Sequence, residues 1–342
     1  MVTGRAVPVV ATRGGSLSPA VGDGIGSSPL ARPPIVPRKL GWLSWISTLA
    51  SYVLLLGGSI VSKTESGDAC GRTWPLCQGV LLPEHWSWAM LWEYSHRWVA
   101  GVVGILVITV AVLAWRSCGQ VRFVRTLVLS SVGFVLLQAI LGALTVKVRG
   151  PLEQKTVLAL HFGFSMLAFA STALLTVAIH RLLRRPSEPF STLSVPLSMG
   201  VMVYIGLVAI YLVAYTGAWV RHMHATLSCG MVFPHCHDGL WLPDWTTPAG
   251  IHRFHRWMAI SLWLGLCGFA AWVVRKRGGS TFFRRRLLWV AAIFTGQLWT
   301  GIAVVLWGES LWIALLHPTL VTIGFTALAE MGLRVRCRSQ RA

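Results

Sequence analysis

The sequence predicts an all-α integral membrane protein with eight transmembrane helices, arranged as two pseudo-symmetric four-helix bundles. Three observations lead to this fold class. Hydrophobic residues make up 54% of the 342 residues and charged residues only 12%, about half the charged share of an ordinary soluble domain. Apolar runs of roughly 20 residues, the length that crosses a bilayer, recur along the chain. Unusual residues of the first half recur at a fixed offset in the second half.

Eight apolar runs account for the eight predicted helices. In lipid a backbone must satisfy its own hydrogen bonds, so each run is expected to be a helix, and the alternating pattern of a membrane barrel is not seen. The runs lie near residues 41–62, 89–115, 126–146, 156–180, 197–219, 253–274, 287–307 and 311–333.

The distribution of basic residues predicts the orientation of these helices. The net charge of +19 would indicate nucleic acid as a partner of a soluble protein, but here most basic residues fall in the tails and in alternate loops. The opposite loops carry only Lys63, Arg72, Lys147, Arg149, Lys155 and Arg221. By the positive-inside rule, we expect a plasma-membrane protein with both termini in the cytoplasm. The expected partners of the basic residues are anionic lipid headgroups, not nucleic acid.

The chain is expected to divide into four parts. Residues 1–40 form a disordered basic cytoplasmic tail that is rich in Pro, Gly and Ser and has no removable signal peptide. Residues 41–185 and 186–333 form the N-terminal and C-terminal four-helix bundles. Residues 334–342 form a second cytoplasmic tail.

An internal repeat relates the two bundles. A shift of 159 positions brings polar and small residues of the first half onto identical residues of the second. His161 matches His317 at an offset of 156. Four helices per half is an even number, so both halves cross the membrane in the same direction. The matched pairs are Gly58/Gly217, Cys70/Cys229, Cys77/Cys236, His96/His255, Arg97/Arg256, Trp98/Trp257, Gln138/Gln297 and Gly142/Gly301.

The four repeated histidines are the candidate metal ligands. His96, His161, His255 and His317 lie near the starts of helices that run inward from one face, so they share a depth in the membrane. Ionisable residues inside a membrane are costly and typical of functional sites. Two neutral imidazoles from two helices of a bundle are the axial ligands that heme iron takes, whereas zinc would need further Cys, Asp or Glu ligands. The sequence therefore predicts heme iron in each half.

Charged residues beside these histidines distinguish the halves. Arg97 and Arg256 either extend to lipid headgroups or bind heme propionates, and the two roles can coexist. Glu93 lies three residues before His96, on the same helical face, where His252 stands before His255. Glu93 is expected to move protons or stabilise a developing cation at a reactive site, or else to pair with a nearby cation.

The cysteines form two C-x6-C pairs in the outer loops, Cys70/Cys77 and Cys229/Cys236. The oxidising exterior favours disulfides there, which either staple the loops or take part in redox chemistry beside the heme. Three further cysteines, Cys118, Cys267 and Cys337, are expected to be incidental. The histidines of the second loop are expected to be solvated rather than to bind a metal: His222, His224, His235 and His237.

These motifs resemble the heme A synthase family. The similarity runs from about residue 41 to 333, and the specific part is a cysteine loop followed by Glu-x-x-His-Arg. The matching segments are Gly57-Gly58, Ser66–Cys70, Trp74–Gly79, Glu93–Arg97, Leu137-Gln138, Gly142, Thr145 and Ala159–His161.

The resemblance implies oxidation of the C8 methyl group of heme O to a formyl group, giving heme A for cytochrome oxidase. It implies heme b at His255 and His317, the substrate heme at His96 and His161, an essential acid at Glu93, and a functional pair at Cys70 and Cys77. It also implies a partner, the farnesyltransferase that makes heme O.

This sequence departs from the family pattern at His252, beside the cofactor site, and in the less regular loop Cys229–Cys236. Because the repeat partner of His252 is Glu93, which is not a ligand, His255 is kept as the ligand. A diheme electron-transfer protein or a heme carrier is the alternative function.

Overall fold

The computed structural model describes residue 1 and residues 34–338, apart from 187–192, 238, 240 and 309. Most of the predicted N-terminal tail, residues 2–33, lies outside the described residues. The first helix begins at Arg38, so the last residues assigned to that tail are helical. Pro37 precedes this helix, where its fixed φ and missing N–H do not interrupt the helical hydrogen bonds.

Eight helices in the described residues are long and apolar enough to cross a membrane, which confirms the predicted fold class. They extend past the apolar runs because polar and basic residues continue the helices into the headgroup region. Their bounds are Arg38–Lys63 (α1), Trp88–Cys118 (α2), Arg122–Lys147 (α3), Pro151–Arg184 (α4), Leu197–His222 (α5), Pro248–Arg275 (α6), Thr281–Leu306 (α7) and Leu311–Arg334 (α8).

Local signals fix several of the helix starts. The Ser87 hydroxyl accepts a hydrogen bond from the Met90 N–H at 3.2 Å at the start of α2, and Thr247 caps α6 through Gly250 N at 3.1 Å. Such caps satisfy backbone donors that have no partner in the first turn, and each stabilises its helix by about 1 kcal/mol. Two helices, α4 and α6, begin with proline, which suits the first helical position.

Each set of four helices closes into a ring of neighbours. Helix α1 contacts α2, α2 contacts α3, α3 contacts α4, and α4 returns to α1; the same cycle joins α5, α6, α7 and α8. The two sets meet where α4 packs against α5 and α8, and α1 against α8. A hydrogen bond of 3.0 Å between the Tyr52 hydroxyl and Thr319 Oγ1 joins α1 to α8. The division into domains at 185/186 stays a prediction.

A short parallel sheet is present that the sequence did not indicate. Strand β1 (Leu193–Pro196) precedes α5, and β2 (Val335–Arg338) follows α8. The two strands pair with Leu193 opposite Val335. The segment predicted only as a C-terminal tail is therefore partly ordered by pairing with a strand more than 100 residues earlier. Strands of four residues carry too little periodicity to be recognised in the sequence.

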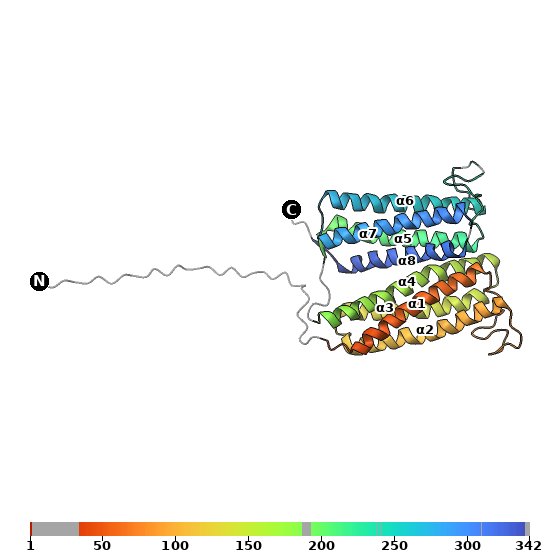
Figure 1. The fold of residues 1–342 in the computed structure, drawn as a ribbon, viewed down its shortest axis with the longest axis horizontal. Helices are drawn as coiled ribbons and strands as arrows, with labels where there is room; N and C mark the ends of the chain where they lie inside the picture. The colour runs from red at the N-terminus through yellow and green to blue at the C-terminus, as the bar shows by residue number, and fades with distance from the viewer. Residues whose placement is uncertain (2–33, 187–192, 238, 240, 309, 339–342) are drawn as a thin grey trace. The chain divides into compact units, whose positions relative to one another are not determined.

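The two cysteine loops lie at the same end of the helices. Residues 64–87 follow α1 and residues 223–247 follow α5, and Figure 1 shows both loops at the end of the helices where α8 begins. The even-numbered helices α2, α4, α6 and α8 all start at this end (Figure 1). This arrangement positions the four candidate ligands near one face.

Candidate functional site

The four repeated histidines lie at similar depths. Each is six to ten residues from the first residue of its helix, which at 1.5 Å per residue is roughly 9–15 Å along the axis. They come from the four helices that start at the end carrying the cysteine loops, namely His96 (α2), His161 (α4), His255 (α6) and His317 (α8). The structure thus brings one pair into each half at comparable distance from that end.

A glycine on the neighbouring helix lies against each of these imidazoles. A Cβ atom built on Gly217 would lie 3.0 Å from His255 Cε1, and one on Gly301 would lie 3.1 Å from His317 Cε1. In the N-terminal half the corresponding distances are 3.3 Å from Gly58 to His96 and 3.5 Å from Gly142 to His161. At these positions the missing side chain lets the ring approach the helix backbone, which explains why the repeat keeps these four glycines.

In the C-terminal half, His255 and His317 line one cavity of about 220 Å³. Its walls are largely apolar. They include Val213, Ile260, Leu262, Phe294, Leu298 and Val321. Three cations also line the cavity: Lys63 from α1, Arg221 from α5 and Arg256 from α6. Apolar walls, two imidazoles and several cations match the needs of a flat apolar macrocycle with iron at its centre and carboxylates at one edge.

Both histidines of this cavity are held by hydroxyl groups. Thr216 Oγ1 lies 2.8 Å from His255 Nδ1, and Thr300 Oγ1 lies 2.9 Å from His317 Nδ1. The Gln297 amide nitrogen lies 3.1 Å from the other ring nitrogen of His317, Nε2. These contacts fix the orientation of the two rings toward the cavity.

In the N-terminal half, His96 and His161 come from α2 and α4 of one ring of helices. Their surroundings differ from those of the C-terminal pair. The Gln138 amide donates to the backbone carbonyl of His161 at 3.1 Å rather than to its ring. The ring nitrogen Nδ1 of His161 is buried and, among the described residues, has no hydrogen-bond partner.

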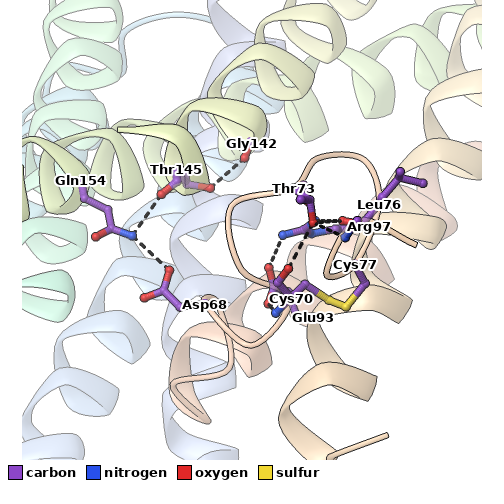
Figure 2. Close-up of polar contacts among 11 residues, drawn as sticks. Asp68, Cys70, Thr73, Leu76, Cys77, Glu93, Arg97, Gly142, Thr145 and Gln154 are labelled. Atoms are coloured by element: carbon purple, nitrogen blue, oxygen red, sulfur yellow. Dashed lines mark hydrogen bonds and ion pairs between the residues drawn. A yellow bond between two sulfur atoms is a disulfide. The ribbon is translucent and has the colours of Figure 1, made fainter. Parts of the chain in front are cut away.

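Glu93 is buried beside His96 and is tied to the first cysteine loop. Only 4% of Glu93 is exposed. One carboxylate oxygen accepts a hydrogen bond of 2.7 Å from the backbone N–H of Cys70, and the other accepts one of 2.5 Å from Arg97. Figure 2 shows the carboxylate between the loop and the guanidinium. These two donors hold the Glu93 carboxylate in one orientation.

The two repeated arginines hold the loops in the same way. Arg97 Nη1 donates to the carbonyls of Thr73 and Leu76, at 2.6 and 2.7 Å (Figure 2). Arg256 Nη1 donates to three carbonyls of the second loop, those of Val232, Pro234 and His235, at 2.8 to 3.3 Å. Each guanidinium therefore holds a cysteine loop against the helix that carries a candidate ligand. A buried Arg256 nitrogen, Nη2, has no partner among the described residues.

Both predicted cysteine pairs are disulfides, Cys70–Cys77 and Cys229–Cys236. The first loop is tethered further by Gln154, whose amide donates to Asp68 and to the carbonyl of Thr145, both at 3.1 Å (Figure 2). Cys118 is a buried free thiol and Cys267 a partly buried one. The side chain of Cys337 lies outside the described residues.

Three histidines that were not predicted to be ligands make other contacts. His235 packs edge-on against Trp241, with ring centroids 4.8 Å apart, and His224 lies 3.6 Å from Glu65. His252 accepts a hydrogen bond of 3.3 Å from Arg256, so its ring takes the place that the Glu93 carboxylate has in the first half. Within the described residues, no three His, Cys, Asp or Glu side chains gather around a common metal position.

Four residues of the site were not predicted from the sequence: Thr216, Thr300, Lys63 and Arg221. The two threonines precede Gly217 and Gly301, which the repeat had already marked. A position-by-position comparison of the repeats would have shown that the hydroxyls occur in the second half only. Lys63 gave no such signal, because only the packing of α1 against α8 brings it to the cavity of the C-terminal half. Arg221, at the end of α5, was considered only as a loop cation.

Comparison with known proteins identifies the family of this chain. A family model for a cytochrome oxidase assembly protein, COX15-CtaA, matches residues 41–329. The heme A synthase of Halalkalibacterium halodurans is 37% identical over 298 residues, 85% of this chain and 95% of that protein. The heme A synthase of Shouchella clausii is 39% identical over 303 residues, 86% and 96% of the two chains. This chain therefore belongs to the COX15-CtaA family of cytochrome oxidase assembly proteins.

Proposed function

We propose that this chain is a heme A synthase, a membrane oxidoreductase that converts the C8 methyl group of heme O to a formyl group. The observation that carries the proposal is the buried Glu93, fixed beside His96 in one half of the repeat only. The full-length similarity to heme A synthases supports it. Written with water as the oxygen donor, the methyl group and one water molecule give a formyl group, four protons and four electrons, and the electrons pass to an external electron acceptor.

The N-terminal half is proposed as the substrate site. His96 and His161 would take the iron of heme O between them, which orients the macrocycle in the half that holds Glu93. The conversion releases protons, and a carboxylate within the site is suited to accept them or to stabilise positive charge at the reacting carbon. The Cys70 N–H and Arg97 hold this carboxylate in one orientation.

The C-terminal half is proposed as the site of a resident heme b. His255 and His317 would ligate the iron, the apolar walls would enclose the macrocycle, and Lys63, Arg221 and Arg256 line the same cavity, where propionates require cations. When bound, such a heme supplies a one-electron redox centre inside the protein. The residues present thus fit the group that the sequence predicts.

The proposed orientation follows from the basic residues of the sequence. Both termini are cytoplasmic, and both cysteine loops face the outside of the plasma membrane. The substrate would come from a membrane enzyme that adds a farnesyl group to heme, and the product would serve assembly of cytochrome oxidase. The site therefore needs to exchange one heme while it keeps the other.

A heme extraction experiment tests the proposed activity. The chain is expressed beside a heme O source, and membrane hemes are extracted with acidic acetone and separated by chromatography. We expect heme A to appear, and Glu93→Gln to lower its yield by about 100-fold or more while heme b stays bound. If heme O remains unchanged in cells that contain wild-type protein with normal heme b, the chain is instead an electron-transfer protein or carrier.

A further inference from the structure

A threonine hydroxyl contacts each candidate ligand of the C-terminal half. Among the described residues, no hydroxyl contact to His96 or His161 is found. Thr216 and Thr300 each precede a glycine that contacts an imidazole. At the shift of 159 residues, Thr216 aligns with Gly57 and Thr300 with Leu141. Neither Gly57 nor Leu141 has a side-chain hydrogen-bonding group. The difference therefore lies in the contacts to the ligand rings themselves.

The hydrogen bonds of these threonines determine which ring nitrogen carries the proton. The Thr216 hydroxyl donates its single proton to the carbonyl of Val213 at 2.8 Å, and that of Thr300 donates to Gln297 at 2.9 Å. Each hydroxyl oxygen can therefore only accept from the imidazole, so His255 and His317 carry their proton on Nδ1. This leaves Nε2 with its lone pair, as iron ligation requires.

The position of Gln297 agrees with this assignment. Its amide nitrogen lies 3.1 Å from His317 Nε2, and an amide N–H donates to a nitrogen that has a lone pair. In the N-terminal half the equivalent Gln138 donates to the His161 backbone. The buried Nδ1 of His161 has no partner in the described part of the chain, and Gly57 lies on the Nδ1 side of His96.

We propose that Thr216 and Thr300 are positioning residues that make the C-terminal heme resident, and that their absence makes the N-terminal heme exchangeable. A partner that holds the second nitrogen of a metal-bound histidine fixes the ring and raises its basicity, and its loss costs 10–100-fold in metal affinity. A substrate site must release its product, so weaker orientation of His96 and His161 is an advantage there. This inference rests on the proposed function for the roles of the two halves.

The test measures heme retention rather than activity. Wild type, Thr216→Val and Thr300→Val are purified with heme b, without a heme O source, and mixed with excess apomyoglobin in detergent. We expect each valine variant to lose heme about 10–100-fold faster than wild type, with a shifted reduction potential. The serine variants, Thr216→Ser and Thr300→Ser, keep the hydroxyl and should retain the wild-type rate.

A matched control excludes a general loss of packing. Thr322 is a buried threonine of α8 whose hydroxyl donates to the Pro318 carbonyl at 2.7 Å. Thr322→Val should leave the rate of heme loss unchanged. Equal loss from this control and from the two test variants would contradict the proposal, and so would valine variants that retain heme like wild type.

The reciprocal substitution tests the other half. Leu141→Thr places a hydroxyl at the position that Thr300 has beside His317. In protein loaded with heme O, this variant should release the N-terminal heme more slowly than wild type, and unchanged release would contradict the proposal. Since heme b retention is measured without substrate, absence of heme A formation would overturn the proposed function and leave the threonine result standing.

Discussion

The Glu93–Arg97 ion pair links the candidate reactive site to the first cysteine loop. The two side chains are one helical turn apart in α2, and only 5% and 10% of their side-chain surfaces are exposed. Removal of one partner from such a buried pair leaves the other charge without compensation, which costs more than an exposed pair contributes. The Arg97 guanidinium also donates to two loop carbonyls, so one group binds both the loop and the carboxylate.

Substitution of Arg97 by lysine should disconnect the first cysteine loop from Glu93. A single ammonium group cannot reproduce the planar fork that binds Glu93, Thr73 and Leu76. We expect Arg97→Lys to lower the free energy of unfolding in detergent by about 1–3 kcal/mol and to lower heme A yield while heme b stays bound. Thermal unfolding followed by circular dichroism and heme extraction measure the two effects. Arg72→Lys, in an exposed part of the same loop, is the control; an equal loss in both variants would contradict this role.

At the residue scale, the repeat drew attention to the histidines and arginines, because each has a copy in the other half, and to Glu93, because His252 stands in its place. Their functional roles stay predictions. The threonines were not predicted, because their role depends on hydroxyl-to-ring contacts across two helices. The contacts of Arg97 and Arg256 with loop carbonyls were also invisible, since loop conformation does not follow from periodicity.

At the scale of elements, each cysteine loop is closed by an equivalent disulfide, but the two loops make different contacts with the helices below them. Both disulfides close loops of the same length. Only in the first does the backbone N–H of a disulfide cysteine, Cys70, bind the carboxylate of Glu93. The first staple therefore positions a candidate catalytic group. In the second loop the clamping arginine is paired with His252 instead.

Loss of each staple should therefore have a different consequence. Cross-linking of a loop this short contributes roughly 2–3 kcal/mol through the unfolded state. We expect Cys70→Ser/Cys77→Ser and Cys229→Ser/Cys236→Ser to lower stability by similar amounts. Heme extraction should show a stronger fall in heme A for the first double variant, since Glu93 loses its fixed donor. A stronger fall for the second would contradict the assignment of the reactive site to the N-terminal half.

Helices α7 and α8 are joined by a buried carboxylate. Glu330 binds Arg286 of α7 and Arg334 of its own helix, and both guanidinium groups lie over the ring of Phe282. We expect Glu330→Gln to lower the free energy of unfolding by about 2 kcal/mol, as measured by thermal denaturation in detergent. The exposed Glu84→Gln is the control, and no difference between the two would show that the cluster is not structural.

The elements themselves were largely predictable. Each apolar run became a helix because lipid leaves the backbone no alternative. The helix ends were less predictable, since α4 begins at Pro151, five residues before the predicted run. The strand pair of Leu193–Pro196 and Val335–Arg338 was not predicted. Its hydrogen bonds join segments far apart in sequence, and no local pattern encodes such a pairing.

At the scale of the whole molecule, the repeat yields two similar sites with unequal surroundings. Helices α4, α5, α8 and α1 meet between the halves, and Lys63 of α1 reaches the cavity of the second half. The sequence predicted two pseudo-symmetric bundles whose sites differ at Glu93 and His252. It did not predict that the first half contributes a cation to the second, because this depends on tertiary packing. We propose that the N-terminal half binds the substrate heme and that the C-terminal half retains heme b.

The heme content of purified histidine variants tests this assignment of the two halves. Each of the four ligands is replaced by alanine in cells that supply heme O, and bound hemes are extracted and quantified. We predict that His255→Ala and His317→Ala lose heme b. His96→Ala and His161→Ala should retain heme b and form no heme A. The opposite pattern, in which His96→Ala loses heme b while His255→Ala keeps it, would contradict the account.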